Sequence, residues 1–284
     1  MNKKKIKIKT KRTLIKMILK PLINNPKLTK EIFVRDENNK KLKVHSIVER
    51  PLTLYLNEQE IVTMMTICDY PKYLAIGYLL NQNMLKKNDK ITGIDYDEEI
   101  NTVVVRTKLK TNYEEKLKKK TLTSGCAQGT IFGDIMEEFE KIKLSKTAKI
   151  KASWLIKLLK EINTTPSLYL KARAIHGCVL CKKDKDKVYM EDVGRHNAFD
   201  KIAGYMYKKS IKPNDKIFYT TGRLTSEMII KTVKMRIPIL ISRNGFTSWG
   251  VELAKKSNLT LIGRTKGKRF MALSGMHRII YDKN

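Results

Sequence analysis

The stretch DKIFYTTGRLTSEMIIKTVKMRIPILISR, residues 215–243, predicts a strand, a turn, a helix and a second strand in that order. The first and last segments are rich in β-branched and aromatic residues, and the segment between them spaces its apolar residues as a helix does. A strand–helix–strand unit usually pairs its strands in parallel and lays the helix on one face of the sheet. The stretch therefore predicts a layered α/β fold.

The same alternation extends over the rest of the C-terminal half, which we assign to one domain over residues 146–284. Strands alternating with helices imply a mixed sheet flanked by helices, and ligands tend to bind such sheets where strand ends meet helix starts. The expected helices cover 149–163, 197–209, 225–235 and 249–257, and the expected strands cover 167–175, 187–193, 215–221, 238–243 and 259–264.

The N-terminal region, residues 31–125, is predicted to be smaller and rich in strands. One amphipathic helix starting at Pro71 interrupts the strands, and a helix at 133–142 follows a cysteine-containing loop at 123–130. The first twenty residues hold nine Lys or Arg and no acid. Such a block is typical of a solvated segment, so we expect a basic, mobile arm over residues 1–30.

Composition limits the classes of function. The 59 Lys and Arg against 28 Asp and Glu give a formal charge of +31, which invites a nucleic-acid interpretation. The lysines are spread over every segment and no aromatic residues interleave with them, so we rank nucleic acid below other partners. No apolar run approaches the length of a membrane span, and Lys16 and Lys20 interrupt the segment that comes nearest to a signal peptide. We expect a cytoplasmic protein.

Three turns in the C-terminal half combine glycine, basic residues and helix-capping hydroxyls, the groups that bind phosphate. The first, TTGRLTSEM at 220–228, offers Gly222, Arg223 and Ser226, and the second is SRNGFTSWG at 242–250. The third, RTKGKR at 264–269, surrounds a glycine with four basic side chains. Any one of these could be a capped helix or a basic turn, but three at equivalent strand ends favour phosphate binding.

The polar stretch MEDVGRHNAFDK, residues 190–201, has two interpretations. In the first, Glu191 and Asp192 cap the following helix and pair with Arg195. In the second, His196 titrates near neutral pH and serves in proton transfer or ligand orientation.

Cysteine usage points to reduced thiols, because four cysteines without an export signal do not suggest a disulfide framework. Cys178 and Cys181 form a Cys-x-x-Cys pair, but on one strand they project to opposite faces, so we do not expect them to bind a metal. Cys126 stands in TSGCAQGT, residues 123–130, where the glycines and hydroxyls predict an accessible loop. We therefore expect Cys126 to be exposed and not part of a core.

The motifs ERPLTLYLN, YLAIGYLL, TSGC, AIHG, EDVGRHNAFDK, TTGRLTSEM and IGRTKGKR occur in this order over about residues 45–280. The series resembles the formate dehydrogenase accessory sulfurtransferases, the FdhD family. The resemblance implies a cytidine-deaminase-like C-terminal domain that binds cofactor, and a homodimer. It also implies sulfur transfer from a cysteine desulfurase to the bis(molybdopterin guanine dinucleotide) molybdenum cofactor of formate dehydrogenase.

Carried over residue by residue, the resemblance makes Cys126 the persulfide carrier. Together with the turns described above, it predicts that the cofactor and GDP-like nucleotides bind at Gly222, Arg223, Ser226, His196, Arg264, Thr265, Lys266, Gly267, Lys268 and Arg269. This sequence departs from the family pattern at Gly129, where a second loop cysteine usually stands, and at Gln82 and Asn83, which replace Glu-Gly. A relay with a single cysteine remains chemically sufficient.

Two other classes of protein share some of these features. A zinc nucleobase deaminase needs His-x-Glu, and none of the four histidines is followed at the second position by Glu, so that enzyme is discarded: His45, His176, His196, His277. A cofactor-binding chaperone without sulfur chemistry remains open, because the missing second cysteine could accompany a pocket that is kept and a relay that is lost.

Overall fold

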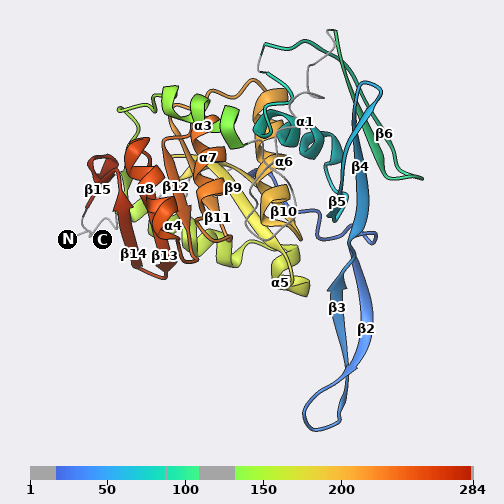
Figure 1. Ribbon diagram of the computed structural model, residues 1–284. Coiled ribbons are helices and arrows are strands. Elements are labelled where there is room, and N and C mark those ends of the chain that lie inside the picture. The colour runs from blue at the N-terminus through green and yellow to red at the C-terminus, as the bar shows by residue number, and fades with distance from the viewer. Residues whose placement is uncertain (1–16, 87, 109–131, 283–284) are drawn as a thin grey trace, which may run out of the picture.

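The computed structural model describes residues 17–86, 88–108 and 132–282 of the chain. Its largest element is a seven-stranded sheet built mainly from the C-terminal half, and a four-stranded sheet from the N-terminal half stands beside it (Figure 1). Two helices, α1 and α6, lie between the two sheets. The chain thus forms two layered units that share one helical joint.

The seven-stranded sheet has the order β1-β10-β9-β11-β12-β13-β14. Its central strands β11, β12 and β13 run parallel, with Ile217 opposite Ile239 and Ile239 opposite Thr260, which confirms the unit predicted from residues 215–243. Antiparallel β9 and β14 flank them, so the sheet is mixed as expected. The strands are β1 Met17–Leu19, β9 His176–Lys182, β10 Lys185–Asp192, β11 Lys216–Thr220, β12 Ile239–Ser242, β13 Thr260–Lys266 and β14 Arg269–Ser274.

Helices cover both faces of this sheet. Successive residues of β9 alternate between the two cores: Cys178 and Leu180 pack on the side of α3, α6, α7 and α8, whereas Val179 and Cys181 pack on the side of α4. This alternation is the two-residue period of a strand buried on both faces. The helices are α3 Phe132–Lys141, α4 Ala152–Thr164, α6 Arg195–Lys208, α7 Ser226–Lys234 and α8 Ser248–Lys256.

The N-terminal sheet has the order β5-β4-β7-β6 and packs on α1. Helix α1 packs with one face on this sheet and with the opposite face on α6. The residues of α1 from Leu74 to Leu79 are therefore all buried. A separate hairpin, β2–β3, projects away from both sheets (Figure 1). The bounds are β2 Thr29–Arg35, β3 Lys41–Ile47, β4 Arg50–Leu56, β5 Gln59–Thr66, α1 Pro71–Asn81, β6 Ile91–Asp97 and β7 Thr102–Thr107.

The joint between the two units depends on two glycines. A Cβ atom added to Gly77 of α1 would lie 1.7 Å from the carbonyl oxygen of Asp200 in α6. A Cβ added to Gly204 of α6 would lie 1.9 Å from the carbonyl oxygen of Tyr73 in α1. The two helices therefore cross backbone against backbone, which only glycine permits.

Two expectations prove wrong. Residues 167–175 do not begin as a strand: α5 Leu168–Ala172 forms there, because the Ser167 side chain accepts a hydrogen bond from the Leu170 N–H and caps a helical turn. The basic arm expected over residues 1–30 does not include residues 17–30, since β1 pairs in parallel with β10 and Leu28 is buried. The short elements β8 Ile150–Lys151, β15 Ile279–Ile280 and η1 Met276–Arg278 complete the described chain.

The C-terminal core also reaches further than residues 146–284. Phe139 of α3 and Leu144 are buried against α6, α7 and α8, so the helix after the cysteine loop belongs to this domain. No helix in the described residues is both long and apolar enough to cross a membrane.

Candidate functional site

The carboxyl ends of β11, β12 and β13 meet at one edge of the sheet, as parallel neighbours must. Main-chain hydrogen bonds join the loops that follow them: Leu224 N–H donates to the Gly245 carbonyl (2.9 Å), and Arg264 N–H donates to the Asn244 carbonyl (3.0 Å). The Thr247 N–H returns a bond of 3.1 Å to the Leu224 carbonyl. The first two of the predicted turns and the start of the third thus form one continuous surface, which we call the junction site (residues 221–226, 243–247 and 264–265).

Positive charge converges on this surface. His176, at the start of β9, lies at the same edge and its Nδ1 is 3.2 Å from the hydroxyl of Thr221. Burial lowers the pKa of His176 below its usual value, and nearby positive groups lower it further: Arg195, Arg243, His196 and Arg223. Basic side chains from the β10–α6, β11–α7 and β12–α8 connections therefore lie near His176.

An aromatic ring holds two of the arginines at this edge. The guanidinium of Arg243 lies 4.5 Å from the ring centroid of Tyr169, and that of Arg173 lies 4.9 Å from it. A hydrogen bond from Arg243 and its positive charge lower the pKa of Tyr169. Stacking of this kind fixes the plane of a guanidinium, which is what bidentate recognition of a phosphate requires.

Two buried hydroxyls in the junction site are without hydrogen-bond partners among the described residues. They belong to Thr225, the N-cap of α7, and to Thr265, which follows Arg264 in β13. The two residues are 5% and 3% exposed. Because a buried hydroxyl without a partner costs free energy, the pair favours a bound ligand that accepts hydrogen bonds.

His196 has a defined partner. Its Nε2 lies 3.2 Å from a carboxylate oxygen of Glu227, the second residue of α7. Burial lowers the pKa of His196 below its usual value, although the hydrogen bond to Glu227 opposes this shift. His196 is the second residue of α6, so this contact joins the first turn of α6 to the first turn of α7 beside the junction site.

The other predicted binding residues occupy two settings. Gly222 packs against the side chain of Arg195: a Cβ added to Gly222 would lie 3.1 Å from the Cβ and the Cδ of Arg195. Ser226 begins α7, three residues after exposed Arg223. Arg264 stacks its guanidinium 5.2 Å from the Phe246 ring centroid. The remaining residues form the turn beyond the sheet edge, with Gly267 at φ 60° and exposed basic neighbours: Lys266, Lys268, Arg269.

The acidic pair at 191–192 has a different role from the one expected. Glu191 accepts the N–H groups of Leu168 (2.7 Å) and Tyr169 (3.1 Å), so it caps α5 and not α6. Burial raises the pKa of Glu191 to about 7. By holding the first turn of α5, Glu191 positions Tyr169 under Arg243.

Asp192 joins the two units of the fold. It forms an ion pair with Lys201 and accepts a hydrogen bond from Thr66 at the end of β5, while Lys201 also pairs with Asp69. Burial opposes the charged form of Lys201, yet the two carboxylates raise its pKa above the usual value. This network is therefore a structural connection between the N-terminal sheet and α6.

The three described cysteines are poor nucleophiles. Burial raises the pKa of Cys178 and of Cys181 to about 12 and that of half-buried Cys68 to about 11. The Cys-x-x-Cys pair lies on opposite faces of β9 as predicted, and no cluster of metal-binding side chains occurs in the described part of the chain. Cys126 lies outside the described residues.

Three members of the site were not identified from the sequence: Tyr169, Arg173 and half-buried His176. Tyr169 and Arg173 fall in the segment that was expected to be a strand, and only the fold brings them beside Arg243. The sequence did hold one signal for α5, because a serine at Ser167, after Pro166, is a common residue at the start of a helix.

These features define a class: an α/β protein with a cluster of basic side chains at the ends of parallel strands, joined through a helix pair to a second sheet. The model of the FdhD/NarQ family matches residues 47–280, so this chain belongs to that family.

Relatives and a solved structure agree with this assignment. The sulfur carrier protein FdhD of Bacillus pumilus is 28% identical over 263 residues, covering 90% of this chain and 99% of that protein. The protein of the same name from Bacillus subtilis is 27% identical over 245 residues, covering 84% and 92%. The crystal structure of a formate dehydrogenase accessory protein from Desulfotalea psychrophila matches with a TM-score of 0.71 and 25% identity, covering 89% of this chain and 99% of that one.

Proposed function

We propose that this protein is a sulfur carrier for the maturation of formate dehydrogenase, that Cys126 carries the sulfur, and that the molybdenum cofactor is the acceptor. Family membership over residues 47–280 supports the carrier role, as do the names of the relatives.

The choice of Cys126 rests on the other thiols. A thiolate is the attacking species in sulfur exchange, and a thiol whose pKa is about 11 or 12 is almost entirely protonated at neutral pH. Cys126 is the fourth cysteine, and lysines precede it at 116 and 118–120. Its thiolate attacks the outer sulfur of a cysteine desulfurase persulfide, a new S–S bond forms, and the donor cysteine leaves as a thiolate.

The junction site has the groups that bind a diphosphate, and this supports the molybdenum cofactor as the acceptor. The observation that carries this part is the pair of unpartnered hydroxyls of Thr225 and Thr265, at the same edge as the guanidinium groups that stack on Tyr169 and Phe246. Guanidinium groups, hydroxyls and the first turn of α7 are suited to diphosphate groups. The two guanine dinucleotide arms of the molybdenum cofactor carry such diphosphates, so GDP should bind here as a fragment of the acceptor.

Covalent geometry relates the two parts. Cys126 precedes Phe132, the first residue of α3, by six residues, which span at most about 21 Å. Helix α3 packs beside α7, and α7 starts at the junction site. The thiol is therefore tethered to the same domain that offers the anion site.

Mass spectrometry after incubation with a cysteine desulfurase and cysteine tests the carrier role. We expect an adduct of one sulfur atom on Cys126 that is absent from Cys126→Ser and present in the control Cys68→Ser. An adduct on Cys178 or Cys181 would move the relay to that pair. If no thiol gains sulfur while GDP binds the junction site, the protein is a cofactor-binding chaperone, the role that Gly129 leaves open.

A further inference from the structure

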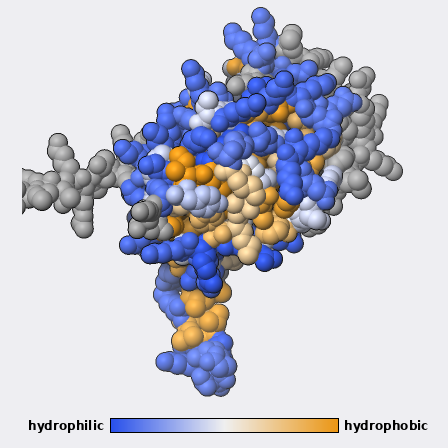
Figure 2. All heavy atoms as spheres, turned by 90° about the vertical axis from the view of Figure 1, so that its left-hand side faces the viewer, coloured by the Kyte–Doolittle hydropathy of each residue, from blue (hydrophilic) through white to orange (hydrophobic). Residues whose placement is uncertain are grey.

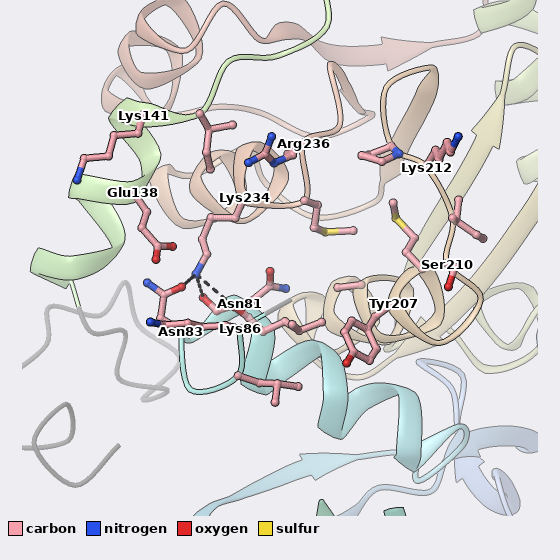
Figure 3. A pocket seen from close by; sticks show the side chains of 18 residues that line it. Asn81, Asn83, Lys86, Glu138, Lys141, Tyr207, Ser210, Lys212, Lys234 and Arg236 are labelled. Atoms are coloured by element: carbon pink, nitrogen blue, oxygen red, sulfur yellow. Dashed lines mark hydrogen bonds between the residues drawn. The ribbon is translucent and has the colours of Figure 1, made fainter. Parts of the chain in front are cut away.

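A cavity of about 850 Å³ opens at the end of the sheet opposite the junction site. The C-terminal ends of α1, α6 and α7 form it together with α3 (Figure 3). Helix α7 has nine residues, about 14 Å, and separates the cavity from the junction site. The cavity is thus a second surface of the same domain, and the cofactor proposal makes no use of it.

The floor of the cavity is apolar. Half-buried and buried side chains of α1, α6 and the segment after α7 line it, and the volume is in the range of pockets that accept a drug-sized ligand or several side chains. The floor residues include Leu80, Leu85, Ile142, Met206, Ile211 and Met235.

The polar groups inside the cavity are already satisfied. Lys234 donates hydrogen bonds to the carbonyls of Leu80 (3.3 Å) and Asn81 (3.1 Å) and to the side chain of Asn83, as Figure 3 shows. Lys234 thereby caps the carbonyl end of α1. Asn83 has φ 58°, a left-handed conformation that asparagine tolerates, at the position where the family pattern has glycine. These groups hold the wall together and are not aimed at a ligand.

The rim carries the charge. Four exposed cations surround the opening, against the single acid Glu138 among the residues that line it. Within the described chain none of the four forms an ion pair, so no described carboxylate neutralises their charge: Lys86, Lys141, Lys212, Arg236. An apolar floor below a ring of cations is complementary to an apolar side chain flanked by carboxylates.

We propose that this cavity docks a segment of a partner protein in which acidic residues surround one apolar anchor. Two features favour a peptide over a nucleotide: the inward polar groups are occupied, and the unpaired cations lie on the rim, where they meet a chain that crosses the opening. A second copy of this chain matches the cationic rim of this cavity less well, because it has only 28 Asp and Glu against 59 Lys and Arg. The inference extends the proposed function, because a sulfur carrier must dock its donor and its client, and α3 begins six residues after Cys126.

Fluorescence anisotropy with a labelled peptide, one Leu flanked by Asp and Glu, tests the proposal at physiological salt. Lys212→Glu/Arg236→Glu should weaken binding at least about tenfold, because reversal replaces two attractions with two repulsions. The matched control Lys30→Glu/Lys40→Glu makes the same change of net charge on the β2–β3 hairpin and should bind as the wild type does. Replacing the peptide's Leu with Ser should weaken binding to the wild type but hardly affect the reversed variant.

Three results would overturn the proposal. The first is no binding at about 1 mM peptide, the weakest affinity that docking of this kind would need. The second is an equal loss of peptide affinity in the reversed variant and in the hairpin control. The third is displacement of the peptide by GDP, which would make the cavity a nucleotide site. The assay involves no sulfur transfer, so Cys126→Ser should bind the peptide normally. Failure of docking and failure of the carrier role are therefore distinguishable.

Discussion

Replacing Gly204 with Ala should disrupt the joint between the two units of the fold. The added Cβ would lie 1.9 Å from the Tyr73 carbonyl oxygen, where ordinary contacts begin near 3.4 Å, so α1 must move by about 1.5 Å. Such a shift is larger than the slack in the 2.6 Å hydrogen bond from Asn81 Nδ2 to Asp200 Oδ1, which links the same two helices. The substitution therefore costs packing and a buried hydrogen bond together.

The expected loss can be bounded. Overpacking costs about 1–3 kcal/mol and a buried hydrogen bond about 1 kcal/mol, while the better helix propensity of Ala returns up to about 1 kcal/mol. The net loss of about 1–3 kcal/mol corresponds to a fall in Tm of roughly 2–12 °C for a chain of this size.

Differential scanning calorimetry measures this shift. Gly93→Ala in β6 is the matched control, because its added Cβ meets only the Arg106 guanidinium at 3.7 Å, and its Tm should stay near that of the wild type. If Gly204→Ala melts together with this control, the backbone-to-backbone crossing of α1 and α6 is not a constraint and the reasoning fails.

The other predictions concern pH, the chain start and the nucleotide. The pKa of Glu191 is raised to about 7 from 4.5, so its contribution to stability is complete below pH 4.5 and is lost as the pH rises through 7, by roughly 3 kcal/mol. In urea unfolding, the free energy of unfolding of Glu191→Gln should fall less over this pH range than that of the wild type. Equal falls in the two proteins would contradict the prediction. Deleting residues 1–25 should lower the Tm because β1 is lost, whereas deleting 1–16 should not; equal Tm values would make β1 dispensable. Reversing Lys266 and Arg269 to Glu should weaken GDP binding about tenfold in calorimetry, and an unchanged affinity would remove that turn from the site.

The sequence was sufficient where periodicity and burial agree. Residues 215–243 predicted β11, α7 and β12 because their apolar runs are buried on a sheet with helices on both faces. The same rule failed at Tyr169, where alternating apolar residues suggested a strand but a Ser167 cap and the distant Glu191 carboxylate stabilise a helical turn. Periodicity carries no information about a partner more than twenty residues away.

The parts of the candidate site that lie in turns could be predicted from the sequence, because turns have characteristic residues. Glycine, basic and hydroxyl residues at the three strand ends identified the junction site, and parallel pairing brought them together. The sequence could not show which cations face His176, because that depends on how β9 runs antiparallel to β11. Nor could it show the cavity, whose walls come from four helices separated in the chain.

The loops of the junction site are fastened to one another by their peptide groups, through the amides and carbonyls of Leu224, Gly245, Asn244 and Arg264. Main-chain bonds do not depend on which side chain a residue carries. Related proteins can therefore exchange the side chains that face the ligand while these main-chain hydrogen bonds stay in place. We expect ligand preference among descendants of this fold to change by single substitutions, without a period of reduced stability in between.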